Sequence, residues 1–117
     1  MLEPGERTLV PTGVAVAIPP GFCGLVLPRS GLALRHGVTC LNSPGLVDPN
    51  YRGELRVILV NHGAEPFIAT AGDRIAQLLV VPFAAAALCV VDALPPGGDD
   101  RGANGFGSSG LGRKDGA

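Results

Sequence analysis

Apolar residues in this chain occur in short runs that proline and glycine interrupt every few positions. The chain has 11 prolines and 18 glycines, and the aliphatic runs between them cover residues 7–10, 14–18, 23–27, 38–41, 55–61, 67–70, 75–81 and 88–91. Closely spaced short runs with turn signals between them predict an all-β sandwich or barrel. Residues 84–88 have helical propensity, but the following valines favour a strand. The pattern predicts one helical turn, at residues 31–36.

The composition changes near residue 95. Eight of the last 23 residues are glycine, and a segment so poor in apolar side chains cannot form a packed core. We therefore predict a β domain over residues 1–94 and a flexible glycine-rich tail over residues 95–117.

Size and charge limit the classes of function. At 117 residues and a net charge of −1, the chain lacks the broad basic face that nucleic acid requires. The longest apolar run, residues 78–91, is interrupted by Pro82 and is shorter than the roughly 20 residues that span a bilayer. No signal peptide is visible. The sequence predicts a cytoplasmic protein that binds neither nucleic acid nor membranes.

Cysteine and histidine show no metal-site spacing. Cys23, Cys40 and Cys89 are odd in number and contain no Cys-x-x-Cys pair, so free thiols in a reducing compartment are expected. His36 and His62 have no partner at ligand spacing. A His/Cys metal site is not predicted.

Two segments carry groups suited to an anion. In the run at residues 28–33, Arg29 offers planar donors, Ser30 a hydroxyl, and Gly31 close access to backbone N–H groups. In the run at 72–78, Gln77 interrupts an apolar strand, where a ligand could satisfy its amide. A solvated arginine in an ordinary loop and a surface-facing glutamine are the structural alternatives. Asp73 and Arg74 are expected to shape the turn.

The segment at residues 42–55 carries the strongest signal. Asn42-Ser43-Pro44-Gly45 is a turn sequence, and a hairpin there would expose backbone groups able to read the edge of a flat base. Asp48 could deprotonate a water, and Tyr51 could stack on a sugar. The alternative is that Asp48 only starts a turn and that Tyr51 fills the core.

The tail contains residues that are unusual in a disordered segment. Arg101, Phe106 and Ser108 lie among glycines. A lid would use all of them, with the aromatic ring over a base and the arginine, serine and backbone amides around phosphates.

These four segments, taken in their order along the chain, resemble those of the trimeric dUTP diphosphatases (dUTPases). The resemblance implies an all-β fold of the β-clip, or distorted jelly-roll, type. It also implies a homotrimer with shared active sites that hydrolyses dUTP to dUMP and diphosphate with Mg²⁺. The phosphate ligands would be Arg29, Ser30, Gly31 and Gln77. Uracil would be read by Asn42, Arg56 and the backbone of Gly45, Leu46, Val47 and Asp48. Asp48 would activate the attacking water, Tyr51 would exclude ribose, and Arg101, Phe106, Gly107 and Ser108 would form the lid.

One motif of that family is missing. Family members carry an Ala-Gly-x-Asp-Leu run ahead of the equivalent of Thr12, and this chain does not contain it. Either the start codon has been placed too late, which is the favoured reading, or the chain is a genuine fragment with weakened metal positioning and an exposed sheet edge. No protein ligand for the metal is predicted, so Mg²⁺ would be held through the substrate phosphates.

Two other readings remain open. The first is a nucleotide-binding or regulatory protein that has lost catalysis. The second is a relative of deoxycytidine triphosphate deaminase, which places a glutamate where this chain has Ile58.

Overall fold

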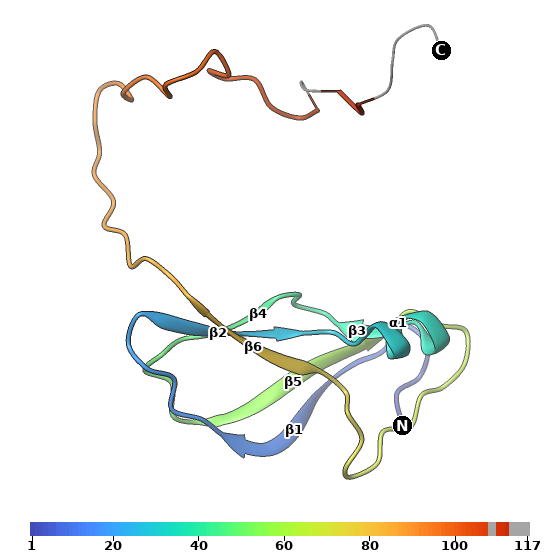
Figure 1. Ribbon diagram of the computed structural model, residues 1–117. Coiled ribbons are helices and arrows are strands. Elements are labelled where there is room, and N and C mark those ends of the chain that lie inside the picture. The colour runs from blue at the N-terminus through green and yellow to red at the C-terminus, as the bar shows by residue number, and fades with distance from the viewer. Residues whose placement is uncertain (108–109, 113–117) are drawn as a thin grey trace, which may run out of the picture. The chain divides into compact units, whose positions relative to one another are not determined.

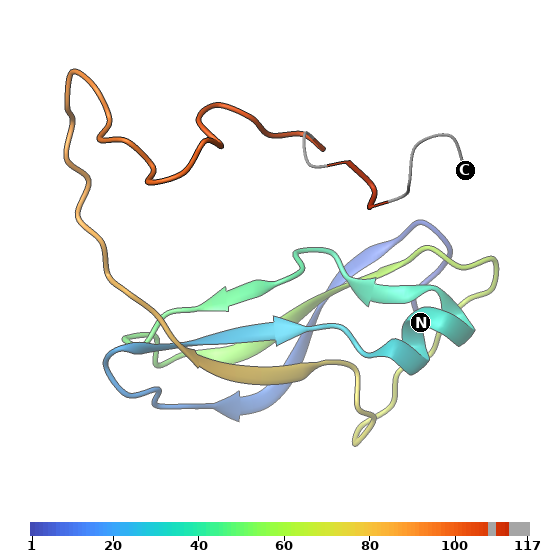
Figure 2. The same ribbon diagram turned by 45° about the horizontal axis from the view of Figure 1, so that its top comes forward.

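Two antiparallel sheets of three strands each form the folded part of the chain (Figures 1 and 2). The computed structural model describes residues 1–107 and 110–112, and these fall into two units, Met1–Ala85 and Ala86–Ala117. The first sheet has the order β1-β5-β3, and the second has the order β4-β2-β6. The strands are β1 (Arg7–Ala15), β2 (Phe22–Leu27), β3 (Val38–Cys40), β4 (Gly45–Val47), β5 (Glu54–Asn61) and β6 (Gln77–Pro82). The all-β prediction is confirmed, although the described residues do not close into a barrel.

Strand β1 is bent where it passes the start of β5. Its register with β5 shifts between Pro11 and Ala15, so that three residues on β1 stand opposite Leu55 alone. Gly13 in this bulge has φ +71°, a conformation that glycine adopts at little cost. The sequence predicted two separate strands here, and the bulge is the reason that a single strand looked like two.

The helix α1 (Ser30–His36) follows β2 and is capped by Gly37. Gly37 has left-handed geometry, and its N–H caps carbonyl groups of the last turn. The predicted helical turn is therefore confirmed. None of the helices formed by the described residues has the length and apolar character needed to cross a membrane.

Between β3 and β4 the chain crosses from one sheet to the other. β3 pairs with β5, whereas β4 pairs with β2. The predicted hairpin around residues 42–45 is therefore wrong, because the strands on either side of this turn do not pair with each other. The turn instead moves the chain onto a new partner, and it includes a cis Ser43–Pro44 peptide bond.

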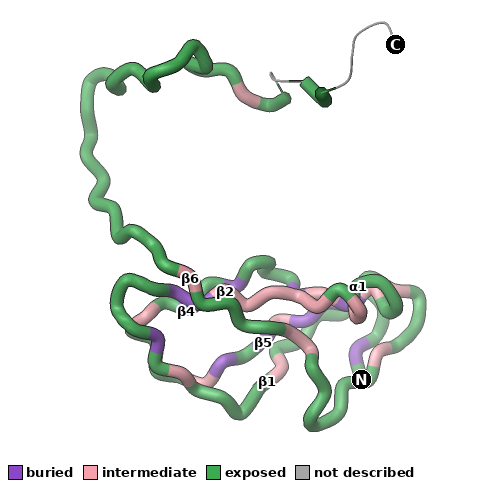
Figure 3. The backbone as a smooth tube through the Cα atoms, in the orientation of Figure 1, coloured by how far each residue is buried: buried purple, intermediate pink, exposed green. Residues whose placement is uncertain are grey.

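The core lies between the sheets and is aliphatic (Figure 3). β5 supplies most of it, because buried Leu55, Val57 and Leu59 alternate with more exposed residues along the strand. One cluster consists of Leu2, Val38, Cys40, Val57 and Leu59, and the other of Ile18, Val47 and Leu55. None of the described residues after Ala85 is buried.

Two predicted strands are not formed. In the run at 67–70, only Phe67 pairs, through an isolated bridge to Leu2. The run at 88–91 has no neighbouring strand, and both Leu88 and Val90 are fully exposed. An apolar run needs a hydrogen-bonding partner along its length to become a strand. The described chain offers the first run only the bridge to Leu2, and it offers the second run no partner.

Asn61 ties together three segments at the end of β5. Its side chain is completely buried. Its Nδ2 donates hydrogen bonds to the carbonyl oxygens of Leu2 (2.9 Å) and Glu65 (2.8 Å), and its Oδ1 accepts one from the N–H of Gly63 (2.8 Å). Every polar atom of the amide thus has a partner, as a buried polar group requires. The amide fixes the N-terminus against the loop that packs under α1.

Candidate active site

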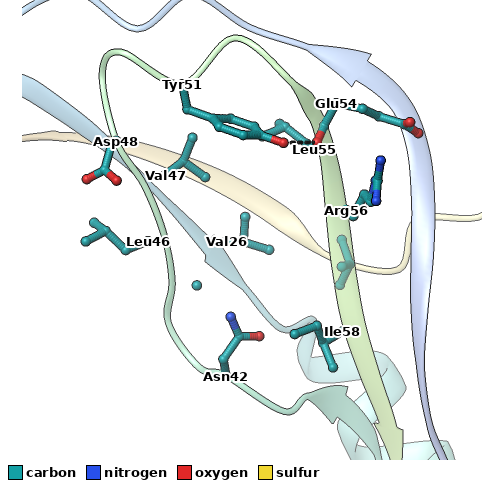
Figure 4. A pocket seen from close by; sticks show the side chains of 12 residues that line it. Val26, Asn42, Leu46, Val47, Asp48, Tyr51, Glu54, Leu55, Arg56 and Ile58 are labelled. Atoms are coloured by element: carbon teal, nitrogen blue, oxygen red, sulfur yellow. Dashed lines mark hydrogen bonds between the residues drawn. The ribbon is translucent and has the colours of Figure 1, made fainter.

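The largest concentration of predicted site residues lies between β4 and β5. These strands follow each other in the chain but do not pair, because β4 is bonded to β2 and the C-terminal half of β5 to β3. A pocket of about 330 Å³ occupies the gap (Figure 4). We call it the crossover pocket, and its lining is Val26, Asn42, Gly45, Leu46, Val47, Asp48, Tyr51, Glu54, Leu55, Arg56, Val57 and Ile58.

Alternation along β4 sets the floor and the rim of this pocket. Gly45 and Val47 are buried, whereas Leu46 and Asp48 are exposed. β4 is an edge strand of its sheet, so its backbone on the side facing β5 carries unpaired N–H and C=O groups. The carboxylate of Asp48 stands at the exposed rim, and Asn42 lies at the opposite end of the pocket (Figure 4).

Tyr51 closes one end of the pocket. Its ring extends from the loop after β4 toward β5 (Figure 4), and its hydroxyl donates a hydrogen bond of 2.7 Å to the carbonyl oxygen of Glu54. The side chain is 45% exposed, so it does not fill the core. The loop behind it is tight, with the Tyr51 N–H bonded to the Asp48 carbonyl and Arg52 bonded to the Pro49 carbonyl.

A second pocket, which we call the arginine pocket, lies at the N-terminal end of α1. It has a volume of about 340 Å³ and is lined by Arg29, Ser30, Gly31, Leu32, Arg35, Arg74 and Gln77. Three guanidinium groups and no carboxylate line it, so it suits a multivalent anion. The predicted phosphate ligands are thus brought together, but they share no lining residue with the crossover pocket.

Gln77 is exposed rather than buried. Its Nε2 donates a hydrogen bond of 2.9 Å to the carbonyl of Pro28, which fixes the strand β6 to the start of the 28–33 segment. Its remaining amide groups are free to face a ligand in the arginine pocket.

Two charged residues of the arginine pocket, Arg35 and Arg74, were not among the predicted ligands. Arg35 lies one helical turn after Gly31, and its guanidinium passes over that glycine, 3.7 Å from where a β-carbon would stand. The four-residue spacing on a short helix was the signal that could have found it. Arg74 was expected only to shape a turn, yet it also lines the pocket. Asp73 does shape the turn, because its carboxylate accepts hydrogen bonds from the N–H and hydroxyl of Thr70.

The predicted lid residues belong to the second unit. Arg101 bonds within its own segment, donating from Nε to the carbonyl of Asn104 at 3.0 Å. Phe106 is fully exposed, with φ +50°, and is followed by Gly107. Ser108 lies outside the described residues. The lid remains a prediction.

Metal-binding groups do not cluster in the described chain. No set of three or more His, Cys, Asp or Glu side chains lies close enough to hold an ion among residues 1–107 and 110–112. The described side chains therefore do not build a Mg²⁺ cage of their own. All three cysteines are free, and burial raises the pKa of the Cys40 thiol, which makes it less reactive.

Comparisons with known proteins agree with this arrangement. The family model described as dUTPase matches residues 1–110. The deoxyuridine 5′-triphosphate nucleotidohydrolase of Anaeromyxobacter sp. is 58% identical over 93% of this chain and 73% of its own length. The enzyme of that name from Syntrophotalea carbinolica is 54% identical over 95% of this chain and 74% of its own length.

Solved structures show the same fold. The dUTPase of Staphylococcus bacteriophage 80alpha with bound dUpNHpp matches with a TM-score of 0.80 and 28% identity, over 94% of this chain and 79% of that one. The dUTPase of phage phi11 of S. aureus, described with a structural Mg(II) ion, matches with a TM-score of 0.68 and 27% identity, over 79% of this chain and 76% of that one.

The two sheets, the pocket beside a free strand edge and the arginine-lined pocket define the class: a β protein with a cavity suited to a multivalent anion. The match of the family model to residues 1–110 makes the class specific. The chain belongs to the dUTPase family.

Proposed function

We propose that this chain hydrolyses dUTP to dUMP and diphosphate, with uracil in the crossover pocket and the triphosphate against an arginine pocket. Hydrolysis of dUTP is the activity after which its relatives are named. The observation that carries the proposal is the gap between β4 and β5, where the backbone edges are left unpaired. The assignments of individual residues rest on the geometry described above.

Uracil is a flat ring with two carbonyl acceptors and one N–H donor on one edge. The free edge of β4 can bond to that edge as a neighbouring strand would. Cytosine has an acceptor at N3 and a donor at N4, where uracil has a donor and an acceptor, and it would leave backbone groups unpaired, which disfavours it strongly. The narrow gap would also exclude the methyl group of thymine.

Asp48 is the proposed general base. As the carboxylate takes a proton from water, the water oxygen bonds to the α-phosphorus. The bond from that phosphorus to the bridging oxygen breaks, and diphosphate leaves with the electron pair. Arg29, Arg35 and Arg74 would stabilise the charge on the departing phosphates. Asp48 stands at an exposed rim, where water has access.

We propose that Mg²⁺ reaches the site on the triphosphate. This ion retains several waters and is commonly bound through substrate phosphates with few protein ligands. When bound, it would neutralise phosphate charge. Chelation by EDTA should abolish turnover, and added Mg²⁺ should restore it.

A homotrimer with shared sites is also proposed. A dUTP molecule needs both pockets, but the two pockets of one chain share no residue. β6 is apolar, yet Leu78, Leu79 and Val80 are all exposed in the single chain, as are Leu88 and Val90. Such surfaces are typical of regions covered by other subunits. The test for the trimer is a solution mass of three times 11.8 kDa.

Mixing two inactive variants tests whether the sites are shared. Asp48→Asn removes the proposed base, and Arg29→Ala removes a phosphate ligand. If one subunit supplies the base and another the arginine, mixed trimers regain part of the activity. Absence of any recovery after subunit exchange would contradict shared sites.

The deaminase reading finds no support at the site. Ile58 lines the crossover pocket at the place where that reaction needs a glutamate. A regulatory protein would bind the same nucleotide at the same site, and it would differ from the enzyme only in failing to hydrolyse dUTP. We also propose the cytoplasm as the location, because three free cysteines suit a reducing compartment.

The decisive assay is incubation of dUTP, dCTP, dTTP and UTP with the purified chain and Mg²⁺, followed by nucleotide chromatography. We expect dUMP and diphosphate from dUTP alone. Asp48→Asn should reduce kcat by roughly 10²-fold or more, and Asp92→Asn, an exposed change outside the pocket, serves as the control. Binding of a non-hydrolysable dUTP analogue without turnover of dUTP would favour the regulatory reading.

A further inference from the structure

The ring of Tyr51 rests on the backbone at Gly53. A β-carbon added at Gly53 would stand 2.5 Å from the Tyr51 hydroxyl oxygen, 2.7 Å from Cζ and 3.1 Å from Cε1. Real β-carbons essentially never approach other atoms within 3.0 Å. The ring therefore occupies space that only a glycine at position 53 leaves open.

Backbone strain does not explain this glycine. Ten glycines among the described residues have positive φ, and Gly53 is not one of them. Gly53 is thus not held by the left-handed backbone conformation that disfavours other residues. The three heavy atoms nearest to a β-carbon at position 53 all belong to the Tyr51 side chain, so the ring is the first obstacle that a larger residue meets.

The β1 bulge holds the start of β5, to which the Tyr51 hydroxyl is bonded. The Tyr51 hydroxyl is bonded to the carbonyl of Glu54, whose own side chain accepts a hydrogen bond of 3.0 Å from the N–H of Gly13. Leu55 follows Glu54 on β5, and its carbonyl accepts a hydrogen bond of 2.6 Å from the hydroxyl of Thr12. The start of β5 is thus held to the β1 bulge by two hydrogen bonds, which oppose a shift of β5 to make room for a larger residue 53.

We propose that Gly53 is a positioning residue that sets the place of Tyr51 and, through it, the discrimination between dUTP and UTP. This inference rests on the proposed function, in which Tyr51 crowds the 2′ position of the sugar. With alanine at position 53, the ring must leave the β5 backbone and lose its bond to Glu54. The sugar end of the crossover pocket then opens, and a ribose fits.

The test compares kcat and KM for dUTP and UTP in four proteins: wild type, Gly53→Ala, Tyr51→Ala and the double variant. We expect Gly53→Ala to reduce the ratio of kcat/KM for dUTP over UTP by about tenfold or more, since a shift of about 1 Å in a positioning group can change rates by up to 10²-fold. In the Tyr51→Ala background, the same glycine change should leave the ratio unaltered, because the ring it displaces is gone.

A control separates this effect from any glycine replacement. Gly97→Ala introduces a β-carbon with no atom within 4 Å and no positive φ, and its ratio should equal that of wild type. A Gly53→Ala protein with wild-type discrimination would overturn the inference. So would an equal reduction of the ratio with and without the tyrosine ring.

A milder variant covers the case in which Gly53→Ala does not fold. Tyr51→Phe removes only the bond to Glu54, and we expect it to reduce the ratio between about twofold and tenfold. An unchanged ratio would refute the proposed placement of the ring. If Tyr51→Ala itself retains full discrimination, then the role of Tyr51 in the proposed function fails, and the inference falls with it.

Discussion

The buried amide of Asn61 allows a stability prediction worked from two of its hydrogen bonds. Replacement of Asn61 by aspartate keeps the size of the side chain and exchanges the Nδ2 donor for an oxygen. That oxygen would face the carbonyl groups of Leu2 and Glu65, which now accept hydrogen bonds of 2.9 and 2.8 Å. Two favourable contacts become two repulsive ones at a site with no solvent exposure.

The expected loss of stability follows from these contacts. Two hydrogen bonds at about 1 kcal/mol each account for about 2 kcal/mol. Burial of an ionised carboxylate against two carbonyl oxygens adds at least about 2 kcal/mol more. A total of about 4 kcal/mol corresponds to a decrease in Tm of roughly 15–30 °C for a unit of this size.

The effect should depend on pH, with a defined sign. Burial raises the pKa of the introduced carboxyl in the folded state above its unfolded value of about 3.9. The protonated group can donate to one carbonyl, so the variant is closest to wild type below that unfolded value. Its stability relative to wild type then decreases as the pH rises through the folded pKa.

Thermal and urea unfolding of both proteins at pH 5 and pH 8, at one fixed protein concentration, checks this prediction. Asn50→Asp makes the same atomic change on an exposed side chain and should alter stability by less than about 0.5 kcal/mol. The reasoning is refuted if Asn61→Asp unfolds within about 1 kcal/mol of wild type at pH 8, or if its deficit is the same at both pH values.

Three further predictions concern single residues. Arg35→Ala should raise KM for dUTP by about tenfold with a smaller change in kcat, measured by steady-state kinetics, and an unchanged KM would remove Arg35 from the phosphate site. Gly63→Ala should destabilise the fold by about 2 kcal/mol or more, because its β-carbon would overlap the His36 carbonyl. An unfolding midpoint at the same urea concentration as wild type would contradict this. Iodoacetamide under native conditions should modify exposed Cys89 before buried Cys23 and Cys40, and peptide mass spectrometry that finds Cys40 labelled first would show that the core opens.

Local pattern was sufficient for some elements and not for others. The alternation along β5 and the Gly37 cap of α1 can be read from the sequence, because both depend on neighbouring residues. β4 was missed as a separate strand, since three residues beside a proline carry almost no periodic signal. The run at 88–91 has strand composition but no partner among the described residues, and composition alone cannot supply one.

In the candidate site, too, some features follow from the local sequence and others depend on contacts between distant residues. The residues predicted to bind phosphate and base were singled out by their residue types and by the resemblance to the dUTPases. Their separation into two pockets depends on which strands pair, and that is decided by contacts distant in the sequence. The position of the Tyr51 ring could not be predicted from the sequence either. It depends on the absence of a side chain at Gly53 and on a bulge about forty residues earlier in the chain.

After residue 41 the chain changes its pairing partner, because β3 pairs with β5 and β4 pairs with β2. This change has a consequence for how specificity is inherited. In the proposed function, recognition at the edge of β4 would be carried by peptide groups, and the side chain of Leu46 is 64% exposed. Replacement of that side chain would leave the recognising atoms where they are. Selectivity for the base would then depend on the path of the main chain, and the residue at position 46 could vary without erasing it.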